Sequence, residues 1–142
     1  MPDKYFCDTN IWVYAYCDPN TESFKTEISE KLITSDYKLI ISNQVLSEFS
    51  NVFLRKYKQT EETVKVLVKS IVNNSEIILT NENTIFLALD LKKKYNVSFY
   101  DSLIISSALS SGCSVLYSED MHHGLIIKEK LQIINPFLTG EK

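Results

Sequence analysis

Four acidic residues of this chain lie beside apolar segments, where a charged side chain is least expected. They are Asp8, Glu48, Asp101 and Asp120. A buried carboxylate is costly unless it is paired or bound to a cation, and a site built from oxygen ligands alone suits Mg²⁺ or Mn²⁺. Carboxylates that hold one or two such ions can activate water and assist an in-line phosphoryl displacement without a nucleophilic side chain. We therefore take the four acids as candidate catalytic and metal-binding residues.

Each acid also has an ordinary structural interpretation. Asp8 follows an apolar run and could cap a helix, and Asp101 ends a Ser-Phe-Tyr-Asp run that resembles a capping box with Asp in place of Glu. Glu48 lies on the flank of a helical stripe, and Asp120 lies in a polar loop. Asp101, however, shares a helical face with apolar residues at i+3, i+4 and i+7. All four ordinary interpretations would have to hold together, which favours a common site.

Strand and helix signals alternate along the chain and must position these acids. The predicted strands are residues 4–7, 38–41, 77–80, 114–117 and 131–134. The predicted helices are residues 11–16, 22–34, 43–56, 61–73, 83–95 and 99–111. Thr60 and Ser98 are the expected N-caps, Gly112 follows the last helix, and residues 18–20 form a turn. Nearly continuous apolar strands that alternate with helices predict an α/β fold, in which a central, mainly parallel sheet of about five strands is covered on both faces.

In such folds, ligands gather beyond the carboxyl ends of the strands. Asp8 and Asp120 each follow a predicted strand, and Asp101 opens a helix that should begin at the same edge. Glu48 belongs to the first turns of a helix that follows a strand, so its side chain can reach this edge. The four acids can therefore converge without an unusual topology.

The composition limits the class of protein. With 142 residues the chain fits one domain, residues 1–142, and a net charge of −3 excludes a strongly basic protein that coats nucleic acid. Three cysteines with no close pair argue against a disulfide framework or a zinc site and favour a reducing, cytoplasmic compartment. No signal peptide or membrane-spanning run is visible. Neither a glycine-rich phosphate loop nor a G-x-S-x-G elbow is present.

The neighbours of the acids carry a resemblance to a known family. The segments in question are Cys7-Asp8-Thr9-Asn10, Leu46-Ser47-Glu48-Phe49, Tyr100-Asp101-Ser102-Leu103-Ile104 and Tyr117-Ser118-Glu119-Asp120. In this order they resemble the successive motifs of the PIN-domain nucleases, over essentially the whole chain. The closing Ile134-Asn135-Pro136-Phe137 is similar to the end of many bacterial VapC-type toxins.

The resemblance implies a three-layer α/β/α PIN-like domain and a metal-dependent ribonuclease, usually the toxin of a type II toxin–antitoxin pair. Asp8, Glu48, Asp101 and Asp120 would form its acidic Mg²⁺ or Mn²⁺ site. Its partners would be an RNA substrate, a cognate antitoxin protein and a second copy of the chain in a homodimer. Three polar residues also match positions of the family motifs: Thr9, Asn10 and Ser118. They would hold the carboxylates in place, although each could equally be a plain turn or cap residue.

Other residues leave two interpretations open. Glu119 could be an extra ligand, but its adjacency to Asp120 favours the opposite orientation. His122 and His123 could donate a proton to the leaving oxygen, or could belong to an exposed loop. Two basic groups could contact phosphates or be solvated helix ends: Arg55, Lys56 and Lys58, and Lys92, Lys93 and Lys94. Three aromatic residues near Asp8 could stack on a base or simply pack: Trp12, Tyr14 and Tyr16.

Two rival functions use the same features. A response-regulator receiver domain also places acids at strand ends, but it normally has two adjacent acids after the first strand and an Asp after the third. This chain has Asp8 alone at the first place and Thr80 at the second, so the fit is poor. A catalytically silent PIN-like scaffold that only binds a partner is the other alternative, and the presence of all four acids weighs against it.

Overall fold

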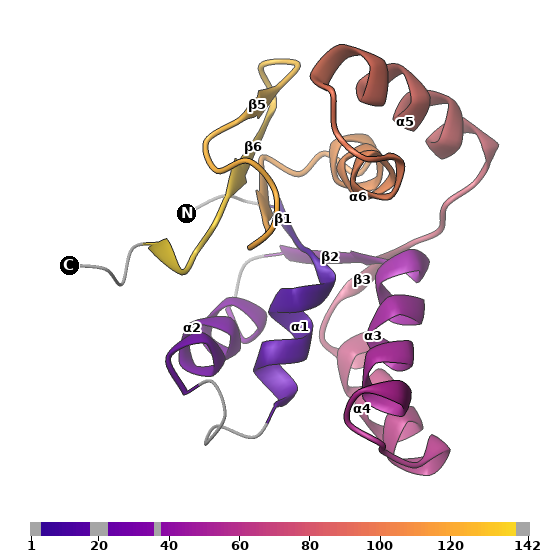
Figure 1. Ribbon diagram of the computed structural model, residues 1–142, viewed down its shortest axis with the longest axis vertical. Helices are drawn as coiled ribbons and strands as arrows, with labels where there is room; N and C mark the ends of the chain where they lie inside the picture. Colours follow the sequence, from indigo (N-terminus) through magenta and orange to yellow (C-terminus); the bar gives the residue numbers. More distant parts are fainter. Residues whose placement is uncertain (1–3, 18–22, 36–37, 139–142) are drawn as a thin grey trace.

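The computed structural model describes residues 4–17, 23–35 and 38–138, and its sheet has six strands in the order β3-β2-β1-β4-β6-β5 (Figure 1). The strands are β1 Lys4–Cys7, β2 Lys38–Ser42, β3 Glu76–Ile78, β4 Val115–Tyr117, β5 Ile126–Ile127 and β6 Leu131–Ile134. All neighbouring pairs are parallel except β5 with β6, which is antiparallel. The turn predicted at residues 18–20 lies outside the described residues.

The third strand and the edge strand differ from the prediction. β3 ends at Ile78 rather than at residue 80, because the backbone N–H and the hydroxyl of Thr80 both donate to Oδ1 of Asn43, at 3.0 and 3.2 Å. β5 was not predicted, since its two residues are too few to form an alternating apolar pattern. The other four strands lie within one residue of their predicted ends.

The helices surround the sheet in two layers. They are α1 Thr9–Tyr16, α2 Ser23–Ile33, α3 Asn43–Arg55, α4 Glu61–Asn73, α5 Glu82–Tyr95 and α6 Phe99–Ser110. In Figure 1, α5 and α6 pack together on one side of the sheet, and the other four helices lie on the opposite side. This arrangement confirms the predicted three-layer α/β/α fold class. No helix in the described part of the chain combines the length and the apolar composition that crossing a bilayer requires.

Local capping explains why the helices begin where they do. Asp8 is the N-cap of α1, so this helix starts two residues earlier than predicted. Thr60 and Ser98 each accept a backbone N–H from the first turn of their helix, as predicted, at 3.1 Å in both cases. Gly112 has a φ of +81°, a conformation that glycine adopts without strain at the end of a helix. The remaining helix ends lie within one residue of the prediction, and residue 22 is outside the described part.

The strand β1 lies at the centre of the sheet and ends directly before Asp8. Tyr5, Phe6 and Cys7 are fully buried between the helical layers. Cys7 is in register with Tyr117 of the parallel strand β4. The residues that follow, Asp8 and Ser118, therefore leave the sheet side by side at its carboxyl edge.

Candidate functional site

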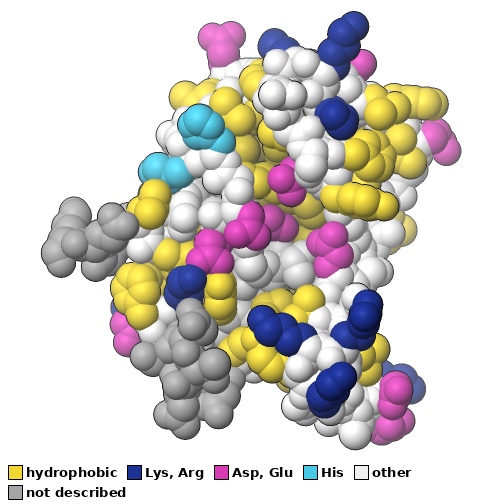
Figure 2. Space-filling view, viewed as in Figure 1, with side chains coloured by type: hydrophobic (Ala, Val, Ile, Leu, Met, Phe, Trp, Pro, Cys, Tyr) yellow, Lys and Arg dark blue, Asp and Glu magenta, His cyan; other side chains and the backbone are white. Residues whose placement is uncertain are grey.

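A pocket of about 430 Å³ at this edge contains all four acids singled out from the sequence. Asp8 caps α1, Glu48 belongs to α3, Asp101 to the first turn of α6, and Asp120 to the loop after β4. Figure 2 shows acidic side chains gathered across the middle of the corresponding face. The structure thus brings together residues from four separate segments, while their catalytic and metal-binding roles stay predictions.

Asp8 is the most buried of the four acids, with 9% of its surface exposed. Its Oδ1 accepts the backbone N–H of Thr9 at 2.7 Å, and its Oδ2 accepts the hydroxyl of Ser118 at 2.9 Å. The pKa of Asp8 is raised to about 6, mainly by burial; the two hydrogen bonds oppose this rise, and the charges of Glu48 and Asp101 add to it. Asp8 therefore combines a fixed orientation with an unusually easy protonation.

Glu48 is half-buried and oriented from two sides. The buried stripe of α3, formed by Val45, Phe49 and Phe53, faces the core and leaves Glu48 on the side of the pocket. Its Oε1 accepts the hydroxyl of Thr9 at 2.6 Å, and its Oε2 accepts an amide N–H of Gln44 at 3.3 Å. The carboxylate is consequently not a freely solvated group on a helix flank.

Asp101 and Asp120 complete the acidic wall, the part of the pocket lining that the four acids form. Burial raises the pKa of Asp101, and the charges of Asp120 and Glu48 add to the rise. A side-chain hydrogen bond with Ser98, the N-cap of α6, opposes this rise. Asp101 also lines the pocket. Asp120 is exposed, and its Oδ2 accepts an amide N–H of Asn10 at 3.1 Å.

The three polar residues expected to hold the carboxylates each bond one of them. Thr9 donates to Glu48, Asn10 to Asp120 and Ser118 to Asp8. Ser118 is fully buried, so water does not compete with Asp8 for its hydroxyl. The contacts are those that a positioning role requires, and the effect of each on activity stays a prediction.

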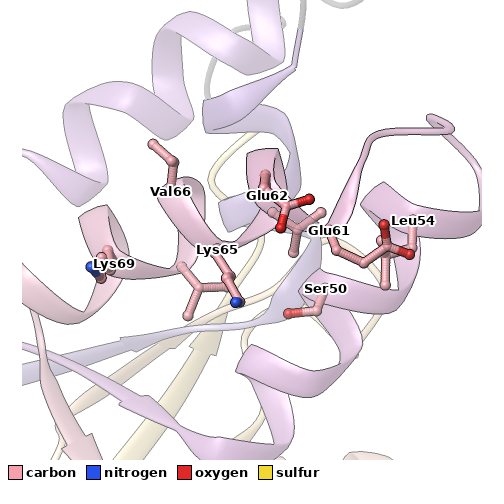
Figure 3. A pocket seen from close by; sticks show the side chains of 9 residues that line it. Ser50, Leu54, Glu61, Glu62, Lys65, Val66 and Lys69 are labelled. Atoms are coloured by element: carbon pink, nitrogen blue, oxygen red, sulfur yellow. The ribbon is translucent and has the colours of Figure 1, made fainter.

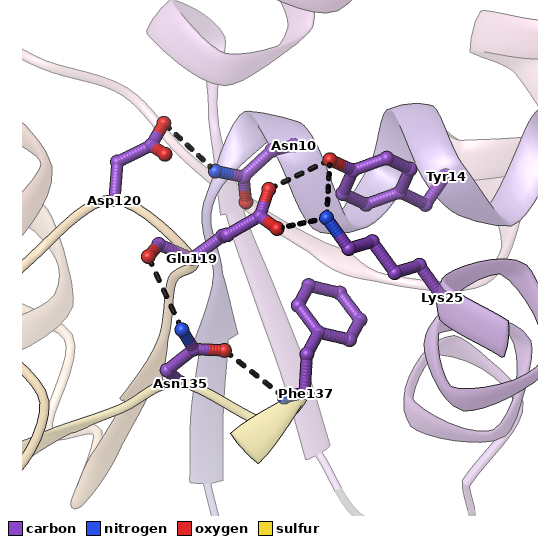
Figure 4. A network of polar contacts seen from close by, with 7 residues as sticks. All are labelled: Asn10, Tyr14, Lys25, Glu119, Asp120, Asn135 and Phe137. Atoms are coloured by element: carbon purple, nitrogen blue, oxygen red, sulfur yellow. Dashed lines mark hydrogen bonds and ion pairs between the residues drawn. The ribbon is translucent and has the colours of Figure 1, made fainter. Parts of the chain in front are cut away.

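Glu119 points away from the acidic wall, although it is adjacent to Asp120. Its Oε1 accepts the hydroxyl of Tyr14 at 2.7 Å, and its Oε2 pairs with the ammonium of Lys25 (Figure 4). Asn135 also donates to its backbone carbonyl at 3.3 Å. The Glu119 carboxylate raises the pKa of Lys25. These contacts pin the loop that carries Asp120.

The donor set of the pocket fits a hard divalent cation. It offers four carboxylates, and two further acceptors, Oδ1 of Asn10 and Oε1 of Gln44, are buried nearby without a hydrogen-bond partner among the described residues. In the part of the chain that the structure describes, however, no three His, Cys, Asp or Glu side chains are grouped closely enough to share an ion.

The rest of the pocket lining is apolar, aromatic and basic, and most of it was not predicted. It is formed by Val13, Tyr14, Val52, Lys56 and Tyr57. The sequence left Lys56 open between a phosphate contact and a solvated helix end, and it gave no signal for Tyr57. The signal for this part of the lining was the spacing of Glu48, Val52 and Lys56 at i, i+4 and i+8, which places them along one face of α3.

Several other candidates lie elsewhere. His122 and His123 are exposed and line no part of the pocket, and Nδ1 of His123 instead accepts the backbone N–H of Asn135 at 2.9 Å. The lysines at 92–94 are exposed at the end of α5, away from the acids. Trp12 is fully buried in the core and cannot stack on a base.

A larger hollow of about 860 Å³ lies between α3 and α4 (Figure 3). Its walls include Ser50, Leu54, Val66 and the oppositely charged Glu61 and Lys65. None of the four clustered acids and none of their hydrogen-bond partners lines it. Size alone therefore does not identify the site, and the smaller acidic pocket carries the chemistry.

Comparison with known proteins gives a family match and a set of similar folds. The family model described as PIN domain matches residues 5–124. A sequence comparison with curated proteins finds no significant match.

Three solved structures illustrate the similar folds. A toxin–antitoxin complex from Klebsiella pneumoniae has a TM-score of 0.66 and 18% identity, covering 93% of this chain and 97% of that one. VapC20 of Mycobacterium tuberculosis, described as a Sarcin-Ricin loop cleaving toxin, has a TM-score of 0.62 and 15% identity, covering 79% and 86%. VapBC2 from Rickettsia felis, bound to a DNA fragment from its promoter, has a TM-score of 0.60 and 22% identity, covering 82% and 88%. At these identities the likeness concerns the fold.

Proposed function

This chain belongs to the PIN domain family, and we propose that it is a metal-dependent endoribonuclease that hydrolyses RNA phosphodiester bonds. The observation that carries the proposal is the convergence of Asp8, Glu48, Asp101 and Asp120 in one pocket. Burial raises the pKa values of Asp8 and Asp101, and the charges of the neighbouring carboxylates add to both rises. Such an arrangement is costly for a protein unless a cation uses it.

Mg²⁺ or Mn²⁺ is the proposed cofactor, held by the four carboxylates. Such a cation supplies charge neutralisation for the attacked phosphate and lowers the pKa of water. The chain itself supplies orientation. Ser118 and the backbone of Thr9 hold Asp8, the hydroxyl of Thr9 holds Glu48, and Asn10 holds Asp120.

We also propose a biological setting for this activity. The chain would act as a single domain over residues 1–142, as the toxin of a type II toxin–antitoxin pair, with a cognate antitoxin protein as its partner and a homodimer as its assembly. The support is the fold shared with a toxin–antitoxin complex, with VapBC2 and with an RNA-cleaving toxin. The adjacent gene offers a simple check, because a toxin of this kind should be encoded beside a small DNA-binding antitoxin.

Calorimetry with Mn²⁺ and a cleavage assay on RNA test the central claim. The wild-type chain should bind Mn²⁺ and cut RNA, and Asp8→Asn and Asp101→Asn should lose both properties while they remain folded. Asp90→Asn is the matched control, since Asp90 is exposed on α5 and lies outside the pocket. Metal-dependent cleavage at the wild-type rate in both pocket variants would refute the proposal.

The same experiment separates the enzyme from a catalytically silent scaffold. A scaffold would bind its protein partner, yet neither bind Mn²⁺ through Asp8 nor cut RNA under any metal condition. The buried oxygens of Asn10 and Gln44, which have no hydrogen-bond partner among the described residues, favour the metal-binding enzyme.

A further inference from the structure

Tyr57 separates the acidic pocket from a second hollow. Its ring lines the acidic pocket and also a neighbouring hollow of about 290 Å³. The second hollow is otherwise lined by Tyr16, Phe53 and Thr63, together with Cys17, Gln59 and Leu67. The two hollows therefore adjoin at Tyr57.

The second hollow has the composition of a base-stacking site. The rings of Phe53 and Tyr57 lie 5.1 Å apart at a tilt of 33°, and the hydroxyl of Tyr57 accepts the thiol of Cys17 at 3.2 Å. These contacts hold the tyrosine ring in place. Exposed Gln59 and Thr63 supply polar groups at the rim. Held aromatic rings with polar neighbours bind single-stranded bases largely regardless of sequence.

A cation stands at the boundary between the two spaces. Lys56 is exposed, lines the acidic pocket, and places its Nζ 5.5 Å from the centroid of the Tyr57 ring. Arg55 and Lys58 are exposed beside it, and Figure 2 shows basic side chains gathered below the acidic ones on the same face. A lysine next to an aromatic ring can contact a phosphate with its ammonium group and a base with the ring. One phosphate and one base are the repeating unit of a nucleic-acid strand.

We infer that Lys56, Tyr57 and the second hollow form a subsite for one nucleotide of a single-stranded RNA. This inference rests on the proposed nuclease function: the acidic pocket holds the phosphate to be cut, Lys56 contacts a phosphate of the same strand, and a neighbouring base enters the hollow and stacks on Tyr57. A base inside a duplex cannot reach the hollow, because it remains stacked and paired. The substrate is therefore an unpaired segment such as a loop.

Binding of labelled oligonucleotides, followed by fluorescence anisotropy, tests the subsite. The protein is the full chain with Asp8→Asn to prevent turnover, in the presence of Mg²⁺. The three probes are a single-stranded RNA, the same strand in a duplex, and a strand of equal length without bases. The single-stranded RNA with its bases should bind more tightly than either of the other probes.

Tyr57→Leu should weaken binding of the base-bearing strand about tenfold and leave the abasic strand unchanged. Thr63→Phe fills the hollow from an exposed position of α4 and should have the same effect; it keeps the backbone N–H that Thr60 accepts. Val66→Phe is its matched control, since Val66 is exposed on the same helix but lies outside this hollow.

Lys56→Gln should weaken both strands and reduce the salt dependence of binding by about 0.7 in the slope of log K against log salt. Lys58→Gln makes the same chemical change two residues away, outside the pocket, and should have a clearly smaller effect. Equal effects of the two lysine variants would show a diffuse charge effect and overturn the phosphate contact.

Equal affinity for base-bearing and abasic strands, or unchanged affinity in both folded Tyr57→Leu and Thr63→Phe, would overturn the base subsite. These outcomes differ from a failure of the nuclease proposal. If the wild-type chain cuts no RNA but the Asp8→Asn chain binds the base-bearing strand in a way that depends on Tyr57, the nuclease proposal fails and the subsite remains. If Tyr57→Leu and Thr63→Phe, each made in the chain with Asp8 intact, both cut RNA with an unchanged KM, the subsite fails and the nuclease remains.

Discussion

Thr9 and Glu48 share a 2.6 Å hydrogen bond from the threonine hydroxyl to Oε1, although they lie 39 positions apart in the chain. The bond joins the first turn of α1 to α3 inside the acidic pocket. A hydrogen bond to a charged acceptor is stronger than one between neutral groups. Thr9 therefore fixes one oxygen of Glu48 whether or not a cation is present.

Thr9→Val should separate this positioning role from folding. Valine has nearly the shape of threonine but cannot donate to Glu48, so metal affinity and cleavage should fall about 10- to 100-fold. Calorimetry with Mn²⁺ and RNA cleavage measure the two effects. Thr9→Ser keeps the hydroxyl and should recover most of both. A valine variant with wild-type metal affinity would show that the bond is only structural.

Asp8→Asn should stabilise the protein when no metal is present. The folded-state pKa of Asp8 is about 6 against an ordinary value of 3.8, so between about pH 4 and 6 the folded state holds a proton that the unfolded state has lost. The free energy of unfolding therefore decreases as the pH rises through this window, by up to about 3 kcal/mol. Asparagine at position 8 carries no charge, so the free energy of unfolding of the variant should not decrease in this way.

Thermal unfolding in EDTA measures the effect. Asp8→Asn should have a higher Tm than the wild type at pH 7, and the difference should shrink towards pH 4. Asp90→Asn, an exposed acid on α5, should show neither change. A lower Tm for Asp8→Asn at pH 7 would mean that its hydrogen bonds to Ser118 and Thr9 outweigh the cost of burial.

Metal binding should reverse the sign of this pH dependence. A cation requires ionised carboxylates, so the affinity for Mn²⁺ should be nearly constant above pH 7 and fall as the pH drops through about 6, where Asp8 takes up a proton. Saturating Mn²⁺ should raise the free energy of unfolding by about 2.7 kcal/mol at 100 times the Kd. EDTA should abolish this increase and the cleavage of RNA together. Cleavage that persists in EDTA would exclude a metal-dependent mechanism.

Lys25→Met should loosen the loop that presents Asp120. Lys25 and Tyr14 hold the carboxylate of Glu119 (Figure 4), and the side chain of Lys25 is 30% exposed. The loss of this partly exposed ion pair should cost about 1 kcal/mol of stability and lower cleavage several-fold through Asp120. The rate of RNA cleavage and the Tm measure the two effects. Lys31→Met, on the exposed face of the same helix α2, is the control and should retain wild-type cleavage.

The sequence by itself predicted all the helices, every strand except β5, and the edge at which the acids meet. Apolar runs predicted the strands, and the caps Thr60 and Ser98 marked helix starts, because these signals depend on neighbouring residues only. The rule that ligands lie beyond the carboxyl ends of parallel strands then placed Asp8 and Asp120 together. The pocket contains all four predicted acids.

Only the tertiary structure decided what surrounds the acids. Glu119 turns to Lys25, 94 positions away, and Tyr57 forms a wall between two hollows. Such contacts join segments whose spacing carries no local signal, so a sequence pattern cannot predict them. The pKa of Asp8 has the same origin, because it depends on burial and on the charges of Glu48 and Asp101. The sequence therefore predicted the acidic residues and the polar residues beside them, and packing of distant segments set the protonation of Asp8, the ion pair of Glu119 and the position of Tyr57.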